Sequence, residues 1–200
     1  MICITRELGS GGEVVGLLVA EELGYAYVDE EIITRAAAEA GLDPAAVRVV
    51  EERRSLARRA FDALAASGPE LPGGGAVLPT RDQSAEIRGY IRDAIVENAG
   101  RGRVVIVAHA AAFAVQPSTS TLRVLVAGTP AVRARRLANE GRDEADAARA
   151  VENGDASRRD YLKQFYGVER ELPTHYDLVL NTDYLDADRA AAIVVHAARD

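Results

Sequence analysis

The sequence predicts an α/β fold of three layers, in which helices cover both faces of a five-stranded parallel sheet. Five short apolar runs recur along the chain, as expected for strands that are buried on both faces of such a sheet. Helical patterns lie between these runs, and alternating strands and helices are typical of parallel α/β folds. The chain has 200 residues, of which 48% are hydrophobic, and this suffices for a single domain with a sizeable core.

The elements follow from these patterns in chain order. The predicted strands are Met1–Thr5, Tyr25–Val28, Arg103–Val107, Leu122–Val126 and Asp177–Asn181. The predicted helices are Val14–Leu23, Glu31–Ala40, a stretch around Val47–Ala66, Ala85–Ala99, Ala131–Asn139, Glu144–Leu162 and Asp188–Arg199. The stretch Ser67–Thr80 is rich in proline and glycine, which predicts a loop. We therefore expect one domain over residues 1–200, with a helical insertion at approximately 31–100 between the second and third strands.

A glycine-rich turn joins the first strand to the first helix. It reads Gly9-Ser10-Gly11-Gly12. The backbone N–H groups of such a turn, together with roughly half a positive charge at the helix N-terminus, form an anion site. The Walker pattern G-x-x-x-x-G-K-[ST], aligned on Gly11, has Arg6 at its first glycine, Gly12 at its lysine and Glu13 at its hydroxyl residue. The amides, the helix dipole and Arg6 predict an anion-binding loop, and a tight turn without a ligand is the alternative.

Composition narrows the function classes. The net charge of −7 disfavours a general nucleic-acid surface, and Lys163 is the only lysine. No apolar run is long enough to predict a membrane span, so we expect a cytoplasmic protein without membrane or nucleic-acid partners. The single cysteine, Cys3, cannot form an internal disulfide, and the histidine and cysteine spacings match no zinc signature. The sequence does not specify an oligomeric state.

Several segments resemble the cytidylate kinase-like family, a branch of the P-loop nucleoside monophosphate kinases whose loop runs G-S-G-G. The segments that carry the resemblance are Ile4–Gly12, Leu23–Ile33, Val104–Ala112, Leu122–Arg136, Asp155–Tyr161 and Tyr176–Thr182. The resemblance implies a P-loop kinase-like fold with a helical acceptor-binding insertion and a lid. It also implies transfer of the γ-phosphoryl group of ATP, as its Mg²⁺ complex, to a nucleoside monophosphate, with CMP or dCMP as the first expectation.

Three residues on the acceptor side follow from the same resemblance. Arg35 is implied to grip the acceptor phosphate, for which a bidentate guanidinium is suited, and Asp29 ends the second strand nearby. His109 stands where the family usually has an arginine that faces the acceptor nucleotide. The alternatives are a solvated helix charge for Arg35, an N-cap for Asp29 and a polar residue at a strand end for His109.

A lid over approximately residues 140–170 is implied to close on the triphosphate. The resemblance places Arg158, and with it Arg159 and Asp155, in this lid, where positive charge would neutralise the transferring phosphoryl group. Arg133 or Arg136 is implied to flank the purine. Because Asp155 and Arg158 are one helical turn apart, an ion pair within the helix is the alternative.

Glu13 is the proposed magnesium ligand, because no hydroxyl residue follows Gly12 and a carboxylate or a water shell must hold the metal. The same residue also supports a second function. Glu13, Val14 and His109 replace residues that are usual in the family, which favours a catalytically impaired nucleotide-binding regulatory module. A kinase for a different small acceptor is the third alternative.

Overall fold

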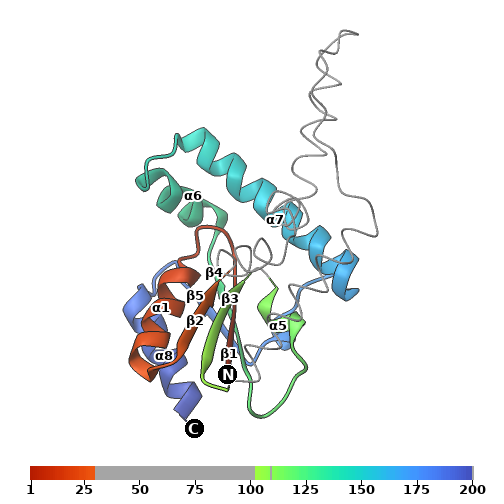
Figure 1. The fold of residues 1–200 in the computed structure, drawn as a ribbon. Coiled ribbons are helices and arrows are strands. Elements are labelled where there is room, and N and C mark those ends of the chain that lie inside the picture. The colour runs from red at the N-terminus through yellow and green to blue at the C-terminus, as the bar shows by residue number, and fades with distance from the viewer. Residues whose placement is uncertain (30–101, 109, 200) are drawn as a thin grey trace, which may run out of the picture.

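The computed structural model of the chain describes residues 1–29, 102–108 and 110–199 (Figure 1). Its strands are β1 (Ile2–Arg6), β2 (Ala26–Asp29), β3 (Val104–Ala108), β4 (Leu122–Ala127) and β5 (Leu178–Asn181). All of them are parallel, in the order β2-β3-β1-β4-β5, so the predicted five-stranded sheet is confirmed. The helices expected within Glu31–Ala40, Val47–Ala66 and Ala85–Ala99, and the loop Ser67–Thr80, lie outside the described residues.

The central strand β1 lies between β3 and β4, with Ile4 paired to Val107 on one side and to Val124 on the other. These three side chains are fully buried, because layers cover both faces of the sheet. Cys3 is buried in the same strand, and burial raises the pKa of its thiol to about 12. β1 therefore forms a rigid base for the turn that follows it.

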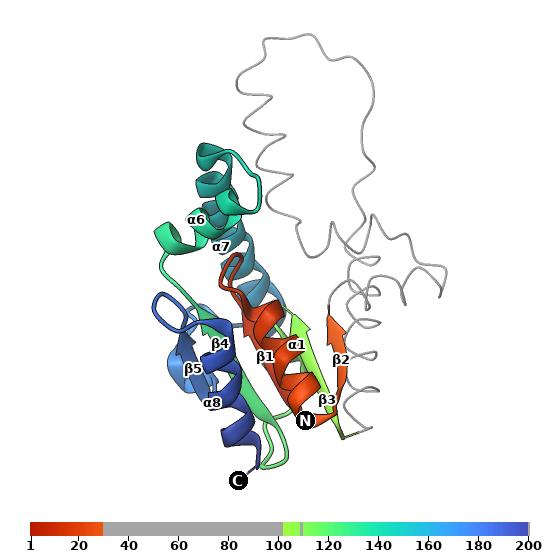
Figure 2. The same ribbon diagram turned by 90° about the vertical axis from the view of Figure 1, so that its left-hand side faces the viewer.

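Helices α1 (Gly12–Leu23) and α8 (Ala187–Arg199) cover one face of the sheet side by side (Figure 2). A Cβ atom at Gly16 would lie 2.4 Å from Cγ2 of Val107, so this glycine allows α1 to pack closely on β3. The opposite face carries α5 (Ala111–Ala114) and the 3₁₀ turn η1 (Pro173–His175). On that face the ring of Phe113 contacts that of Tyr176, with their centroids 5.8 Å apart.

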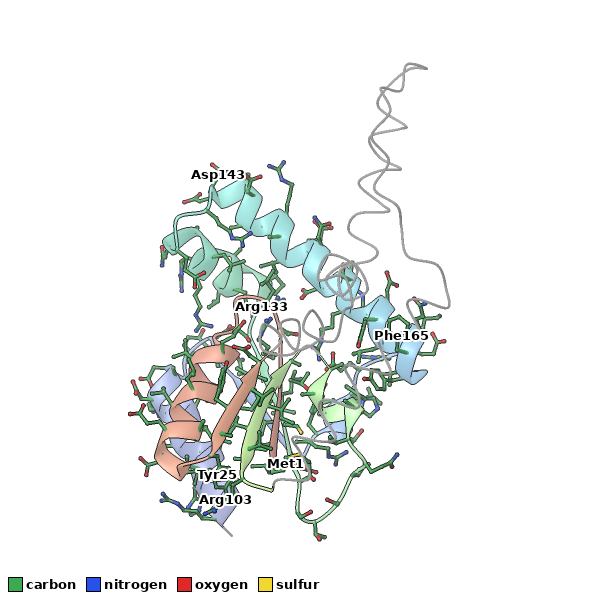
Figure 3. All side chains as sticks on the ribbon, in the orientation of Figure 1. Met1, Tyr25, Arg103, Arg133, Asp143 and Phe165 are labelled. Carbon is green, nitrogen blue, oxygen red and sulfur yellow. The ribbon has the colours of Figure 1, made fainter. Side chains whose placement is uncertain are left out.

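Two further helices, α6 (Pro130–Asn139) and α7 (Glu144–Tyr166), extend beyond the carboxyl edge of the sheet (Figure 1). They pack on each other through Leu137, Ala147 and Val151, and Leu8 of the glycine-rich turn packs against this cluster. Arg133, labelled in Figure 3, lies where α6 meets the sheet. Of the helices described, none has both the length and the apolar character that a membrane span requires.

Candidate functional site

The turn between β1 and α1 has the geometry of an anion-binding loop. Gly9 and Gly11 have φ values of 76° and 80°, a left-handed conformation that favours glycine. The first helical hydrogen bond runs from the N–H of Val15 to the carbonyl of Gly11, and no side chain caps this end of α1. Among the described residues, none accepts a hydrogen bond from the first N–H groups of the helix. The turn thus presents main-chain donors at the positive end of α1.

Arginines from α6 and α7 bind the carbonyl groups of the same turn. Arg136 Nη1 donates to Ser10 O over 3.1 Å, Arg133 Nη1 to Leu8 O over 3.2 Å, and Arg158 Nη1 to Arg6 O over 3.1 Å. The Thr182 hydroxyl, at the end of β5, also donates to Ser10 O over 2.8 Å. These donors offset the partial negative charge of the carbonyls, which would otherwise repel an anion near the turn.

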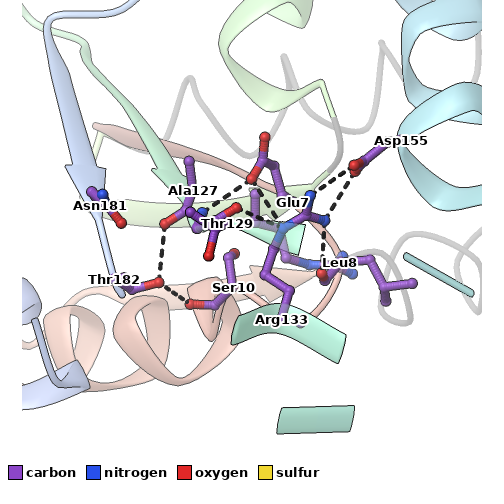
Figure 4. A network of polar contacts seen from close by, with 12 residues as sticks. Glu7, Leu8, Ser10, Ala127, Thr129, Arg133, Asp155, Asn181 and Thr182 are labelled. Carbon is purple, nitrogen blue, oxygen red and sulfur yellow. Dashed lines mark hydrogen bonds and ion pairs between the residues drawn. The ribbon is translucent and has the colours of Figure 1, made fainter. Parts of the chain in front are cut away.

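Arg133 connects the turn, α6 and α7 (Figure 4). Its side chain is 2% exposed and binds both carboxylate oxygens of Asp155, over 2.9 and 2.7 Å. It also donates from Nε to Gly128 O over 2.8 Å, and the same nitrogen lies 3.3 Å from a Glu7 carboxylate oxygen. Burial raises the pKa of Glu7, although a hydrogen bond from Gly128 and the charge of Arg133 oppose this shift. Arg133 and its partners therefore hold the glycine-rich turn against the two outer helices.

Arg158 makes a second buried ion pair on α7. Its guanidinium donates to both carboxylate oxygens of Glu171 and, over 3.2 Å, to the hydroxyl of Tyr176. Burial by itself would raise the pKa of Glu171, but the hydrogen bonds and charge of Arg158 outweigh it and lower that pKa. The Tyr176 hydroxyl also donates to Glu171. Glu171 and Tyr176 therefore fix the guanidinium while it holds the carbonyl of Arg6.

The structure thus brings Arg133, Arg136, Asp155 and Arg158 together around the turn. In this state the two arginines expected to flank a purine, Arg133 and Arg136, are engaged with the turn and its supports. The alternative of an Asp155–Arg158 pair within the helix gives way to pairs across elements, with Arg133 and Glu171 respectively. The predicted contacts of these residues with a nucleotide stay predictions.

Arg159 lies beside a cavity of about 260 Å³ at the same edge. The cavity is lined by Glu7, Asp155, Arg158, Arg159, Leu162 and Val168–Glu171. Both signs of charge occur in its wall, and Glu7 links it directly to the turn. It is the candidate space for a polar ligand beside α7, the helix within the predicted lid.

On the acceptor side, Asp29 ends β2 at the carboxyl edge and is half-buried. Its carboxylate hydrogen-bonds with the hydroxyl of Tyr27, whose pKa is raised to about 12, first by burial and then by the charges of Asp29 and Glu13. The predicted residues Arg35 and His109 lie outside the described residues. Of the predicted acceptor residues, only Asp29 is therefore placed by the structure.

Glu13, the predicted metal ligand, lies in the first turn of α1 and pairs with Arg6, with 2.6 Å between Oε1 and Nε. Within residues 1–29, 102–108 and 110–199, no group of three or more histidine, cysteine, aspartate and glutamate side chains could hold a metal ion. A carboxylate oxygen is a ligand that Mg²⁺ accepts, and this ion usually binds through one or two carboxylates, waters and substrate phosphates. The donor set at the turn therefore suits an ion that arrives with a nucleotide.

Sequence reasoning assigned no role to Glu7, Glu171, Tyr176 and Thr182. Glu7, Tyr176 and Thr182 lie within segments that resemble the family, so their positions carried a signal, but nothing in those segments indicated their partners. Thr182 binds the carbonyl of a residue 172 positions away, and Arg158 binds that of a residue 152 positions away. Only the folded arrangement shows that these residues support the turn.

Comparison with known proteins agrees with the resemblance noted in the sequence. The chain matches the cytidylate kinase-like family over residues 1–184. It is 35% identical over 116 residues to a protein named cytidylate kinase from Pyrobaculum arsenaticum (strain DSM 13514 / JCM 11321 / PZ6), a match that covers 57% of this chain. The match spans 62% of that relative's length.

Solved structures extend the comparison to the fold. An uncharacterized protein from Eubacterium ventriosum ATCC 27560 superposes with a TM-score of 0.69 at 18% identity, covering 100% of this chain and 98% of that one. A shikimate kinase from Acinetobacter baumannii, in complex with shikimate, superposes with a TM-score of 0.54 at 16% identity, covering 98% and 90%. At these identities the likeness concerns the fold alone, and it confirms the predicted three-layer α/β/α kinase-like architecture.

Proposed function

The chain belongs to the cytidylate kinase-like family, and on this premise we propose that it is an ATP-dependent phosphotransferase. The proposed reaction moves the γ-phosphoryl group of ATP, as its Mg²⁺ complex, to a nucleoside monophosphate, with CMP or dCMP as the first candidates. The observation that carries this proposal is the glycine-rich turn at the end of the central strand, with main-chain donors at the uncapped start of α1.

The location of the turn supports the same function. Ligands of open α/β sheets bind outside the carboxyl ends of the strands, where the strand order reverses. Here β1 lies between β3 and β4, and the chain builds one side of the sheet before it crosses to the other. A triphosphate at this point would meet the N–H groups of α1, while the carbonyls of the turn are held by arginines.

The proposed roles are divided between the two sides of the site. The amides of Gly9–Gly12 and the side chain of Arg6 bind donor phosphates. Arg159 lines the cavity of about 260 Å³ beside α7. Asp29, with Arg35 and His109, is the proposed acceptor side. A bound Mg²⁺ would neutralise charge on the phosphate oxygens, and Glu13 or a water shell would hold it.

A second candidate function rests on the Arg6–Glu13 ion pair. A carboxylate at the mouth of the turn opposes a bare triphosphate, which favours a nucleotide-binding regulatory module without turnover. A third candidate keeps the phosphoryl transfer but changes the acceptor, because kinases of other small molecules share this fold.

One experiment separates the three functions. The purified protein is supplied with ATP and Mg²⁺ and a panel of nucleoside monophosphates and other small alcohols, and ADP production is measured beside calorimetric ATP binding. Turnover with CMP or dCMP supports the first function, binding without turnover supports the module, and turnover with another acceptor supports the third. Failure to bind ATP under any condition would contradict all three.

A matched pair of variants tests the role of the turn. Gly11 and Gly24 lie at the two ends of α1, both have positive φ, and a Cβ atom at either would meet nothing within 4 Å. We expect Gly11→Val to abolish ATP binding, because its side chain blocks the approach of phosphate to the amides. Gly24→Val carries a comparable backbone strain far from the turn and should leave ATP affinity unchanged. Equal ATP affinity in two folded variants would refute the proposed binding mode.

A further inference from the structure

The side chain of Arg6 occupies the space that a side chain at position 12 would need, at the mouth of the turn. A Cβ atom built on Gly12 would lie 2.6 Å from Cβ of Arg6 and 3.5 Å from its Cγ and Cδ. Non-bonded carbon atoms do not approach to 2.6 Å, and the position of a Cβ atom is fixed by the backbone, so on this backbone a lysine at position 12 cannot coexist with any side chain at position 6. The side chain of Arg6 thus fills the space in which a Walker lysine would begin.

The guanidinium of Arg6 is also held near the start of α1. Arg6 is the last residue of β1, and its carbonyl accepts a hydrogen bond from Arg158, which fixes its backbone. Its side chain is 11% exposed, and its Nε lies 2.6 Å from Oε1 of Glu13 in the first helical turn. Positive charge is therefore present beside the helix end from which the lysine is missing.

The carboxylate of Glu13 is an exchangeable partner for this guanidinium. The Glu13 side chain is 43% exposed, and ion pairs with a solvated member contribute little stability. A guanidinium bonds phosphate oxygens as readily as a carboxylate, and it can do so in bidentate fashion. An arriving triphosphate can therefore replace Glu13 at Arg6, while Glu13 turns to water or to a metal ion.

We propose that Arg6 and Gly12 have exchanged the roles of two Walker positions. Arg6 stands at the first glycine and supplies the phosphate-binding charge that the lysine otherwise provides, while Gly12 stands at the position of the lysine. The exchange places a glycine where the lysine stood and the cation where the first glycine stood. Arg6 then contacts the donor phosphates directly, with Glu13 as its counter-ion in the free protein. This inference rests on the proposed function, because it assigns a residue to the same donor site.

The surroundings of Tyr27 link this cation to the proposed acceptor residue Asp29 as well as to Glu13. The hydroxyl of Tyr27 responds to the charges of Asp29, Glu13 and Arg6, so these three groups share one region of the carboxyl edge. Asp29 ends β2 on the acceptor side, whereas Glu13 belongs to the donor turn. The cation of Arg6 is therefore close to the proposed acceptor side as well as to the donor turn.

The test is a cycle of substitutions read as calorimetric ATP affinity with Mg²⁺. Arg6→Gln should weaken binding about tenfold or more, the usual effect of losing a charge-assisted hydrogen bond. Gly12→Lys alone should also weaken binding, because its side chain collides with Arg6. In an Arg6→Gly background, however, Gly12→Lys should strengthen ATP binding relative to Arg6→Gly alone. This reversal of sign is the signature of an exchange.

Two further variants keep the test decisive. Glu13→Gln changes an exposed side chain and should tighten metal-free ATP binding several-fold, because it removes a negative charge that repels the triphosphate and competes with it for Arg6. Arg123→Gln removes an arginine at the far edge of the sheet, and its ATP affinity should equal that of the parent. Thermal unfolding of every variant confirms that affinities are compared between folded proteins.

The outcomes distinguish this inference from the function on which it rests. If the parent protein binds no ATP, the proposed function itself fails. If the parent binds ATP but folded Arg6→Gln binds it equally well, or Gly12→Lys weakens binding in both backgrounds, the exchange is overturned and the phosphotransferase proposal stands. Unchanged metal-free affinity in Glu13→Gln would likewise overturn the role of Glu13 as counter-ion to Arg6.

Discussion

The two edges of the sheet carry ion pairs of the same chemistry in different settings. At the amino edge, near Met1 and Tyr25 in Figure 3, Arg123 of β4 pairs with Asp177 over 2.7 Å, and 37% of the Asp177 side chain is exposed. At the carboxyl edge, Arg133 pairs with Asp155 over the same distance but is almost completely buried. Arg133 also binds a carbonyl of the glycine-rich turn, whereas Arg123 binds only Asp177 among the described residues.

The comparison shows which features distinguish the carboxyl edge, where the candidate site lies, from the amino edge. A cavity of about 640 Å³ lies at the amino edge, larger than the 260 Å³ cavity beside the turn. Among the residues that the structure describes, only the carboxyl edge combines its cavity with left-handed glycines, a helix start without a side-chain cap and buried charges that orient main-chain carbonyls. Buried charges cost free energy unless they are paired, so their concentration there shows that paired charges hold the glycine-rich turn to α6 and α7.

The largest effect expected from this comparison is the loss of the carboxylate that pairs with the buried Arg133. Asp155→Ala leaves the buried guanidinium of Arg133 without its bidentate carboxylate, with Glu7 as the remaining carboxylate among the described residues, and we expect a loss of about 3–5 kcal/mol in the free energy of unfolding. Denaturant unfolding followed by circular dichroism measures it. Asp146→Ala, on the same helix and in an exposed pair with Arg149, is the control and should cost at most about 1 kcal/mol. Equal losses would show that the buried network does not support the turn.

The sequence predicted the described part of the fold well, because its strands are continuous apolar runs. Each observed strand begins and ends within one residue of its predicted bounds. The helices α5 and η1 were not predicted, since four and three residues are too few to show a helical period. Helix α7 continues to Tyr166, one turn beyond its predicted end at Leu162, and stops at Gly167, whose φ is 66°.

The candidate site was predicted only in part, and the reason is physical. The glycine spacing and the position after β1 indicated the turn, because both are local features of the sequence. The arginines that the resemblance singled out lie at this edge, but their partners here are carbonyls and carboxylates from distant segments, and their predicted contacts with a nucleotide stay predictions. A local pattern cannot show that Arg136 binds Ser10 or that Arg158 binds Glu171. Gly12 also proved to be the first residue of α1 rather than part of the turn.

An effect of intermediate size is expected when the stability costs of replacing two glycines, one near each edge, are compared. Gly9 and Gly24 both have positive φ, but a Cβ atom at Gly9 would lie 2.8 Å from the carbonyl oxygen of Arg133, whereas at Gly24 it would meet nothing. We expect Gly24→Ala to cost about 1 kcal/mol of unfolding free energy from backbone strain alone. Gly9→Ala should cost about 2–4 kcal/mol, because strain and collision combine. Similar costs would mean that the turn yields readily and is not clamped by α6.

The smallest effect concerns the exposed pair at the amino edge and its dependence on pH. The hydrogen bond from Arg123 lowers the pKa of Asp177, so the carboxylate stabilises the folded state above its ordinary pKa of about 3.9. This contribution is lost as the pH falls through the lower pKa of the folded state.

We therefore expect Asp177→Asn to cost at most about 1 kcal/mol at pH 7, and less in high salt, because the pair is exposed. The difference from the parent should shrink steadily below about pH 4, since Asp177 is then protonated in the unfolded chain and increasingly in the folded one. Urea unfolding of both proteins between pH 3 and pH 7 measures this difference. A cost that is large, or constant across this range, would show that the amino edge relies on its ion pair as strongly as the carboxyl edge does, and the distinction between the two edges would fail.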